Sequence, residues 1–367
     1  MKKCFLEFVS LFAVPFTALL MVLFSGILFS ETLFFETAAM AQERQILLTV
    51  SRNADPAIKK VALSLKDCSV FVTLELSGVT SDSQFIPTAS ERLLPDSEFK
   101  LAAYNNLVIV GLPEQDELLK KCLGHQIALR SGEVESLGYG KWKGDFGTVE
   151  CDRNPFLYSH KVKDNPYSTL IIKISGTSVA GVVKAVDAFR AGMLNGIVPA
   201  GQGELVETTI LDRQPEFIVP PSLPDRLGEF YRVGWTQPNE MEYRAYLDLA
   251  GFEPKQLWRI KYLSKNVFDD VSGEGWNNGL HRLAYGNAVT IAEFNSEQEA
   301  KETWNSFNKS NGAVLETIEN FQCYRFAQPT DEAFDKSYGD VRYFVSGKKL
   351  IAVSLPKTQT LLLIKEL

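Results

Sequence analysis

The sequence predicts an α/β domain followed by an α+β domain, and three observations support this division. Residues 106–111 and 169–175 are short apolar runs that each lead through a turn into an amphipathic helix, as parallel strands covered by helices do. Residues 288–355 instead combine one helix with several strands, and a tight turn joins the last two strands. A proline-rich segment separates the two patterns.

This segment, residues 212–225, reads DRQPEFIVPPSLPD and contains four prolines, which make it stiff and non-helical. We therefore place the layered α/β domain, with a partly parallel sheet, at residues 45–212 and the linker at 213–225. The α+β domain, an antiparallel sheet packed with helices, follows at residues 226–367.

In the first domain, residues 61–76 are rich in Val, Leu and Phe, and we expect them to hold one or two strands. The run NLVIVG at 106–111 predicts a strand covered on both faces. A helix follows over residues 116–123, between an upstream proline and a glycine just past its end. The glycine- and aromatic-rich residues 138–158 predict turns and short antiparallel strands.

Residues 169–175 (TLIIKIS) predict a second buried strand, which residues 176–178 turn into a helix. Either Gly192 or Gly196 is expected to end this helix. Apolar residues recur at helical spacing and form one face, while charged residues lie on the other. The apolar face comprises Val179, Val182, Val183, Val186, Phe189 and Met193.

In the second domain, residues 239–251 predict a helix that ends at a glycine, and residues 288–294 predict a strand. Ser296 and Glu299 form a capping box, which marks the start of another helix. That helix places Ala300, Trp304 and Phe307 on one face. Further strands are expected at 322–326, 341–346 and 349–355, the last two as a hairpin.

Residues 1–41 have the features of an export signal, with a basic start and an uncharged apolar run at residues 8–30. Ala39 and Ala41 are the small residues that signal peptidase reads, so we expect Gln42 to be the mature N-terminus. This predicts an extracytoplasmic protein, either periplasmic, secreted or on the cell surface. A membrane helix needs roughly 20 apolar residues, so an uncleaved membrane anchor at residues 8–30 is the alternative.

The chain has a net charge of −7 and no basic stripe, so nucleic acid is not an expected partner. The cysteines beyond the signal show no Cys-x-x-Cys spacing, and we expect neither a metal nor a cofactor. One or two disulfides are compatible with an oxidising compartment, and buried free thiols are the alternative. These residues are Cys68, Cys122, Cys151 and Cys323.

Gly176, Thr177 and Ser178 form one candidate ligand-binding group, because they precede a helix whose first N–H groups can hold an anion. A purely structural turn is the alternative, since no phosphate-binding glycine motif is present.

Tyr139, Trp142 and Tyr158 form a second candidate group, because they crowd a turn-like stretch and aromatic faces stack on sugar rings. The alternative is that these rings fill the layer between strands and helices.

No catalytic residue is assigned, because the sequence lacks a Gly-x-Ser-x-Gly nucleophile elbow. The acids Asp145, Asp152 and Asp164 suit glycoside hydrolysis or, with Asn154, calcium binding; solvated loop acids are the alternative. Three histidines lack metal-ligand spacing and are expected at the surface or in turns. They are His125, His160 and His281.

Residues 105–193 resemble the Rossmann-like strand–helix units in the C-terminal domains of archaeal-type S-layer proteins. Leu112 and Gln115 depart from that pattern, which has Gly and Asn there. A similar unit occurs in the periplasmic subunit of bacterial cellulose synthases, and residues 226–367 resemble uncharacterised exported α+β domains. The matching pieces are Val110-Gly111-Leu112-Pro113, Tyr139-Gly140 and Ile174-Ser175-Gly176-Thr177, with Ala180, Ala185 and Ala188 in the helix.

Both relatives imply structural or polymer-associated roles outside the membrane. We therefore expect an exported, non-catalytic cell-envelope protein that binds a polymer or another envelope protein. An exported hydrolase of glycan or peptidoglycan, using Asp145, Asp152 or His160, is the alternative. A third hypothesis is an S-layer-like assembly subunit, which would form homo-oligomers. Membrane contact is expected only if the N-terminal segment is uncleaved.

Overall fold

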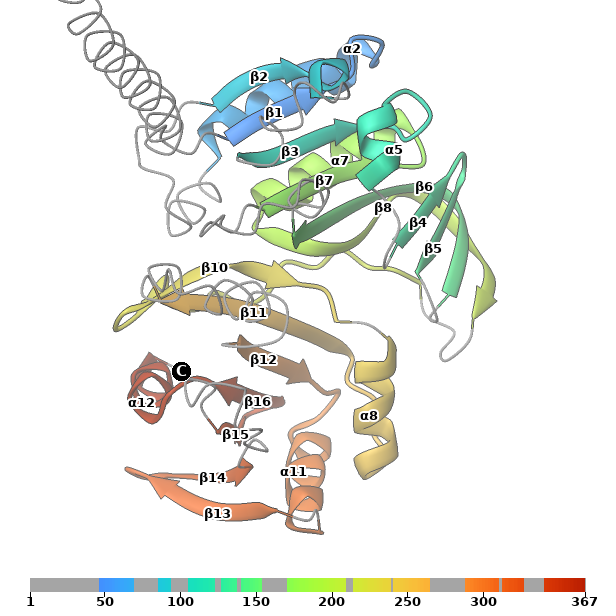
Figure 1. Cartoon of the computed structure of the whole chain (residues 1–367). Coiled ribbons are helices and arrows are strands. Elements are labelled where there is room, and N and C mark those ends of the chain that lie inside the picture. Colours follow the sequence, from blue (N-terminus) through green and yellow to red (C-terminus); the bar gives the residue numbers. More distant parts are fainter. Residues whose placement is uncertain are drawn as a thin grey trace, which may run out of the picture. The chain divides into compact units, whose positions relative to one another are not determined.

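The computed structural model describes residues 46–68, 85–93, 105–122, 127–136, 140–153, 170–208, 214–238, 240–264, 288–309, 312–326 and 340–366. All of them belong to one compact unit, and most of their strands follow the order β13-β14-β15-β16-β12-β11-β10-β8-β6-β7-β3-β1-β2, while β4, β5 and β9 branch from it (Figure 1). The expected mixture of helices with parallel and antiparallel strands is confirmed.

Parallel strands form the last part of this order, from β7 to β2. β1 (Ile46–Val50) pairs in parallel with both β2 (Phe85–Ala89) and β3 (Asn106–Gly111). β3 in turn pairs in parallel with β7 (Leu170–Gly176). Every residue of β3 is buried, as its unbroken apolar run predicts.

Antiparallel strands adjoin β7. β6 (Gly140–Arg153) pairs with β7, with β8 (Met193–Thr208) and with β5 (Glu133–Ser136), and β5 also pairs with β4 (Ile127–Arg130). The prediction of short strands over residues 138–158 was wrong for residues 140–153, because β6 is a single strand. It contains two bulges, so it changes direction where turns were expected.

Helices cover the parallel part. α5 (Glu117–Cys122) and α7 (Val179–Arg190) confirm the two predicted strand–turn–helix units. α7 ends before Gly192, whose φ of 92° favours glycine. Met193, expected in this helix, is instead the first residue of β8.

Residues 61–67 are helical and not strands, which corrects another prediction. They lie in α2 (Pro56–Leu63) and the 3₁₀ turn η1 (Ser64–Asp67). Asp55 caps α2 by accepting the N–H of Ala57 at 2.7 Å, and the buried side chains Ile58 and Ala62 follow at helical spacing. This cap and spacing outweigh the β-propensity of Val61, and residues 69–76 lie outside the described part.

The second half is an antiparallel sheet with helices, as expected. α8 (Glu240–Ala250) and α11 (Glu297–Ser306) share a hydrophobic cluster on one face, and α12 (Lys357–Glu366) packs on the other. Its strands are β9 (Arg226–Leu227), β10 (Phe230–Thr236), β11 (Gln256–Ser264), β12 (Ala288–Glu293), β13 (Ala313–Ile318), β14 (Phe321–Phe326), β15 (Val341–Ser346) and β16 (Lys349–Ser354).

Two local predictions hold in this half. The Ser296 hydroxyl accepts the N–H of Glu299 at 3.1 Å and so caps α11, although the Glu299 carboxylate reaches the N–H of Asn295 and not that of Ser296. β15 and β16 form the predicted hairpin, with Ser346 opposite Lys349.

Both halves contribute to one continuous sheet. β10 pairs in parallel with β8 at Trp235 and Met193, and one hydrophobic cluster contains residues from Ile46 to Ile364. Residues 214–224 are irregular, as the prolines predict, and they accept hydrogen bonds from Trp258 and Tyr262. The division into two domains stays a prediction.

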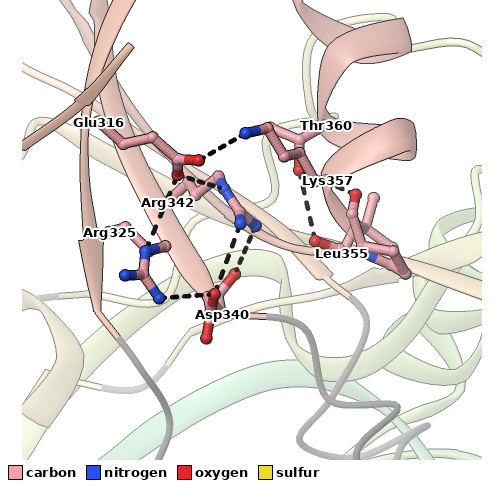
Figure 2. Close-up of polar contacts among 8 residues, drawn as sticks. Glu316, Arg325, Asp340, Arg342, Leu355, Lys357 and Thr360 are labelled. Carbon is pink, nitrogen blue, oxygen red and sulfur yellow. Dashed lines mark hydrogen bonds and ion pairs between the residues drawn. The ribbon is translucent and has the colours of Figure 1, made fainter. Parts of the chain in front are cut away.

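An ion-pair network fixes α12 to the strands beside it (Figure 2). Glu316 on β13 accepts hydrogen bonds from Lys357 at 2.8 Å and from Arg342 at 3.1 Å. Asp340 accepts a hydrogen bond from Arg325 at 3.0 Å. Two carboxylates and three cations therefore hold the last helix and the β13–β15 strands together.

Candidate functional site

The carboxyl ends of β1, β2, β3 and β7 define the candidate site. In open α/β sheets, ligands bind outside these ends, at the point where the strand order reverses. Here the chain passes from β1 to β2 on one side and then to β3 on the other, so the reversal lies between β1 and β3. We call the residues that follow these strands the carboxyl edge. They are Ser51, Arg52, Ser90, Glu91, Asp116, Thr177 and Ser178.

Glu91 ties the segment after β2 to the segment after β1. Its carboxylate accepts the Ser51 hydroxyl at 2.6 Å and the N–H of Arg52 at 2.9 Å. Burial acts to raise the pKa of Glu91, but these hydrogen bonds outweigh it and the pKa is lowered. Glu91 is therefore an ionised acceptor at neutral pH.

A second tie joins β2 to β3. The Ser90 hydroxyl donates to Asp116 Oδ2 at 2.6 Å, and Asp116 Oδ1 accepts the N–H of Leu119 at the start of α5 at 3.0 Å. Asp116 is only 2 % exposed, and burial raises its pKa. Both carboxylate oxygens thus have protein partners.

The predicted anion-binding residues lie at the same edge, after β7. Thr177 Oγ1 accepts the N–H of Phe146 at 2.9 Å and donates to the carbonyl of Gly144 at 2.8 Å. Ser178 accepts the N–H of Gly181 at 3.1 Å and caps α7. A Cβ on Gly176 would lie 2.8 Å from the carbonyl oxygen of Phe146. These groups act as a structural turn that joins β6, β7 and α7.

A buried charge cluster lies on the neighbouring strands β6 and β7. Lys173 Nζ lies 3.2 Å from Glu150 Oε2 and 3.1 Å from Asp152 Oδ2, and it donates to the carbonyl of Cys122 at 3.2 Å. The side chains of Lys173 and Glu150 are 2 % and 3 % exposed. Burial raises the pKa of Glu150. Burial acts to lower the pKa of Lys173, but the two carboxylates outweigh it and that pKa is raised.

Sequence reasoning missed the hydrogen bonds of Glu91 and of Asp116, and it also missed this charge cluster. One signal was present: Thr148, Glu150 and Asp152 alternate with apolar residues along β6, and Lys173 interrupts the apolar run of β7. A charged lysine in a buried strand favours a carboxylate partner nearby, because an unpaired buried charge is costly. The hydrogen bonds of Glu91 and Asp116 left no pattern in the sequence, because their partners Ser51 and Ser90 lie in distant segments of the chain.

The carboxylates of the hydrolase hypothesis do not converge. Asp145 and Asp152 lie on the same strand, and a rise of about 3.3 Å per residue separates them by on the order of 20 Å. Glycosidase pairs stand only about 5 to 9.5 Å apart. Other residues considered for catalysis or calcium binding lie outside the described residues. They are His125, Asn154, His160, Asp164 and His281.

Trp142, the central residue of the aromatic candidate group, is 3 % exposed. It packs with Ile127, Val134, Phe146 and Ile197 in a hydrophobic cluster, so its faces are not available for stacking on a sugar. Tyr139 and Tyr158 lie outside the described residues. Trp142 therefore fills space between strands, which was the alternative.

Among the described residues, Cys122, Cys151 and Cys323 have free thiols, and burial raises the pKa values of Cys122 and Cys151 to about 12. Such thiols stay protonated and poorly nucleophilic at neutral pH. Within the described ranges, no group of His, Cys, Asp and Glu is arranged to hold a metal ion. None of the helices in those ranges is long and apolar enough to span a membrane, and residues 1–45, with the expected cleavage site, lie outside them.

Comparisons with protein-family models, curated proteins and solved structures gave no match to this chain. The resemblance to S-layer domains therefore stays a prediction.

Proposed function

We propose that the chain is an exported, non-catalytic cell-envelope protein that binds an envelope polymer or another envelope protein. The observation that carries this proposal is that polar groups of the carboxyl edge are hydrogen-bonded within the protein. Ser51, Ser90, Glu91, Asp116 and Thr177 hold one another or nearby backbone groups, where an α/β enzyme would present groups to a substrate.

Two further observations support the proposal. The carboxylates Asp145 and Asp152 are too far apart to share one glycosidic bond, and Asp152 is paired with Lys173. The export signal predicted at residues 1–41 supports a location outside the cytoplasm.

A co-sedimentation experiment tests this function. The mature chain, purified from the producing cells, is mixed with insoluble envelope material from the same cells, both intact and freed of protein. We expect the chain to sediment with the intact material, and with the protein-free polymer if the polymer is the ligand. Soluble sugar or peptide fragments should not appear, and their release would overturn the non-catalytic proposal. Failure to sediment with either material would overturn the binding proposal.

A further inference from the structure

Strand β13 ends the strand order, and no other described strand pairs with its outer side. Its inner side pairs with β14 without a register shift, from Ala313 opposite Phe326 to Ile318 opposite Phe321. An edge strand of this kind presents a row of backbone N–H and C=O groups to a new strand.

The register shows which backbone groups point outward. The two-residue loop between Ile318 and Phe321 makes these two residues a hydrogen-bonded pair. Hydrogen-bonded and non-hydrogen-bonded pairs alternate along an antiparallel ladder. The N–H and C=O groups of Ala313, Leu315 and Thr317 therefore point away from β14.

The side chains of this edge favour contact with another strand. Val314 is 49 % exposed and Leu315 is 53 % exposed, and β13 contains neither lysine nor proline. The opposite edge of the sheet, β2, carries the exposed Pro87, which has no N–H to donate. Natural edges are commonly protected by lysine or proline, and β13 lacks both.

The same strand is held from one face by hydrogen bonds. Glu316, between Leu315 and Thr317, accepts hydrogen bonds from Lys357 and Arg342 (Figure 2). A preorganised edge loses less conformational entropy when another strand is added.

We propose that β13 is a self-association edge, which pairs antiparallel with β13 of a second copy of this chain. Leu315 lies on the two-fold axis, and Ala313 pairs with Thr317 of the second copy. All three outward-pointing residues of each strand then form hydrogen-bonded pairs, and the exposed Leu315 side chains cover each other.

Charge complementarity selects the second copy in this orientation. The N-terminal end of β13 follows the exposed Lys309, and its C-terminal end precedes Glu319, whose carboxylate pairs with Lys365 at 3.2 Å and is still 50 % exposed to a second cation. Antiparallel pairing brings the basic end of each copy beside the acidic end of the other, twice by symmetry. Parallel pairing would place like charges together.

The native mass of the mature chain tests this inference, measured by analytical ultracentrifugation over a range of concentrations. The interface is small, so we expect a reversible dimer with a dissociation constant on the order of micromolar. Leu315→Lys places two cations on the axis and should raise that constant at least roughly tenfold. Val206→Lys, at a position that is also 53 % exposed, is the matched control and should leave it unchanged.

A cysteine variant tests the register. Leu315→Cys should form an intermolecular disulfide under mild oxidation, because directly opposite residues lie about 5.5 Å apart. Val206→Cys, the control, should form much less intermolecular disulfide under the same conditions. The inference would be overturned if the chain were monomeric at about 100 µM. It would also be overturned by a dimer whose dissociation constant Leu315→Lys leaves unchanged and in which Leu315→Cys forms no intermolecular disulfide. The co-sedimentation result does not depend on this outcome, so the two proposals fail separately.

Discussion

At the scale of single residues, two glycines set the distance between α7 and β6. A Cβ on Gly181 would lie 2.0 Å from the carbonyl oxygen of Phe146, and a Cβ on Gly147 would lie 2.1 Å from the carbonyl oxygen of Gly181. Backbone atoms occupy both positions, so no side chain can move aside to make room. The contact holds the turn at Thr177 beside β6.

Gly181→Ala tests this contact, because two effects oppose each other. Alanine has the better helix propensity, by about 1 kcal/mol. The overlap with backbone should cost about 2 to 3 kcal/mol or more, so the variant should be less stable. Urea unfolding measures the difference, with Lys184→Ala on the exposed face of α7 as a control expected within about 0.5 kcal/mol. A stabilised Gly181→Ala would show that α7 can shift away from β6.

The buried pair of Glu150 and Lys173 gives a second prediction at this scale. Lys173→Met leaves two carboxylates without their cation and should cost about 3 to 5 kcal/mol of unfolding free energy. Adding Glu150→Leu removes the more deeply buried carboxylate, so the double variant should be more stable than Lys173→Met alone. Denaturant unfolding of both single variants and the double variant measures this coupling. Additive effects would mean that the two side chains do not stabilise each other.

At the scale of elements, the Glu316 network joins α12 to the edge of the sheet. Burial acts to raise the pKa of Glu316, but hydrogen bonds and charges from Lys357 and Arg342 outweigh it, and the pKa is lowered. The folded state therefore favours ionised Glu316. The resulting stability is fully present above the usual value of 4.5 and is lost as the pH falls through the lowered pKa.

Glu316→Gln should remove part of this acid sensitivity. We expect the variant to be less stable than the natural chain at pH 7, and the difference to shrink as the pH approaches about 3. Urea midpoints across that range measure it. Glu297→Gln, which removes an exposed ion pair within α11, is the control and should change the pH dependence less. Equal pH profiles for the natural chain and Glu316→Gln would contradict the assignment.

Sequence patterns predicted the elements whose start and stop signals lie within the element itself. α7, α8 and α11 each have an amphipathic face, and Ser178, Ser296 and Gly251 mark their ends. α2 was missed because the apolar composition of residues 61–76 favours strands, whereas the signals of the helix, the cap at Asp55 and Pro56, lie before residue 61. β6 was divided into short strands because bulges leave glycine signals that resemble turns.

Of the carboxyl edge, the sequence singled out only Thr177 and Ser178, together with the preceding Gly176, because a strand, a turn and a helix are consecutive there. The other contacts of this edge join residues far apart in the chain, such as Ser51 with Glu91 and Ser90 with Asp116. A single sequence contains no pairing information for such residues. Burial of Trp142 was one of the two interpretations that the sequence allowed, but the neighbours that bury it could not be named, since they lie on the separate strands β4, β5 and β8.

At the scale of the whole molecule, the region between β8 and β10 connects the two halves. Trp235 is 4 % exposed, lies against Phe217 with ring centroids 6.0 Å apart, and donates its indole N–H to the carbonyl of Ala191 at 3.2 Å. Gln237 accepts the N–H of Ile197 at 2.9 Å. These contacts join strands on either side of the proline-rich segment.

The shared core predicts that both halves unfold together, which tests the proposed domain division. Trp235→Ala removes a large buried ring from the junction and should cost about 3 to 5 kcal/mol. Because one hydrophobic cluster spans the halves, this loss should lower the hydrogen-exchange protection of β3 and of β12 alike. Exchange followed by mass spectrometry measures the two strands separately. Loss of protection in β12 with β3 unchanged would show that residues 45–212 and 226–367 unfold as independent domains joined by a linker.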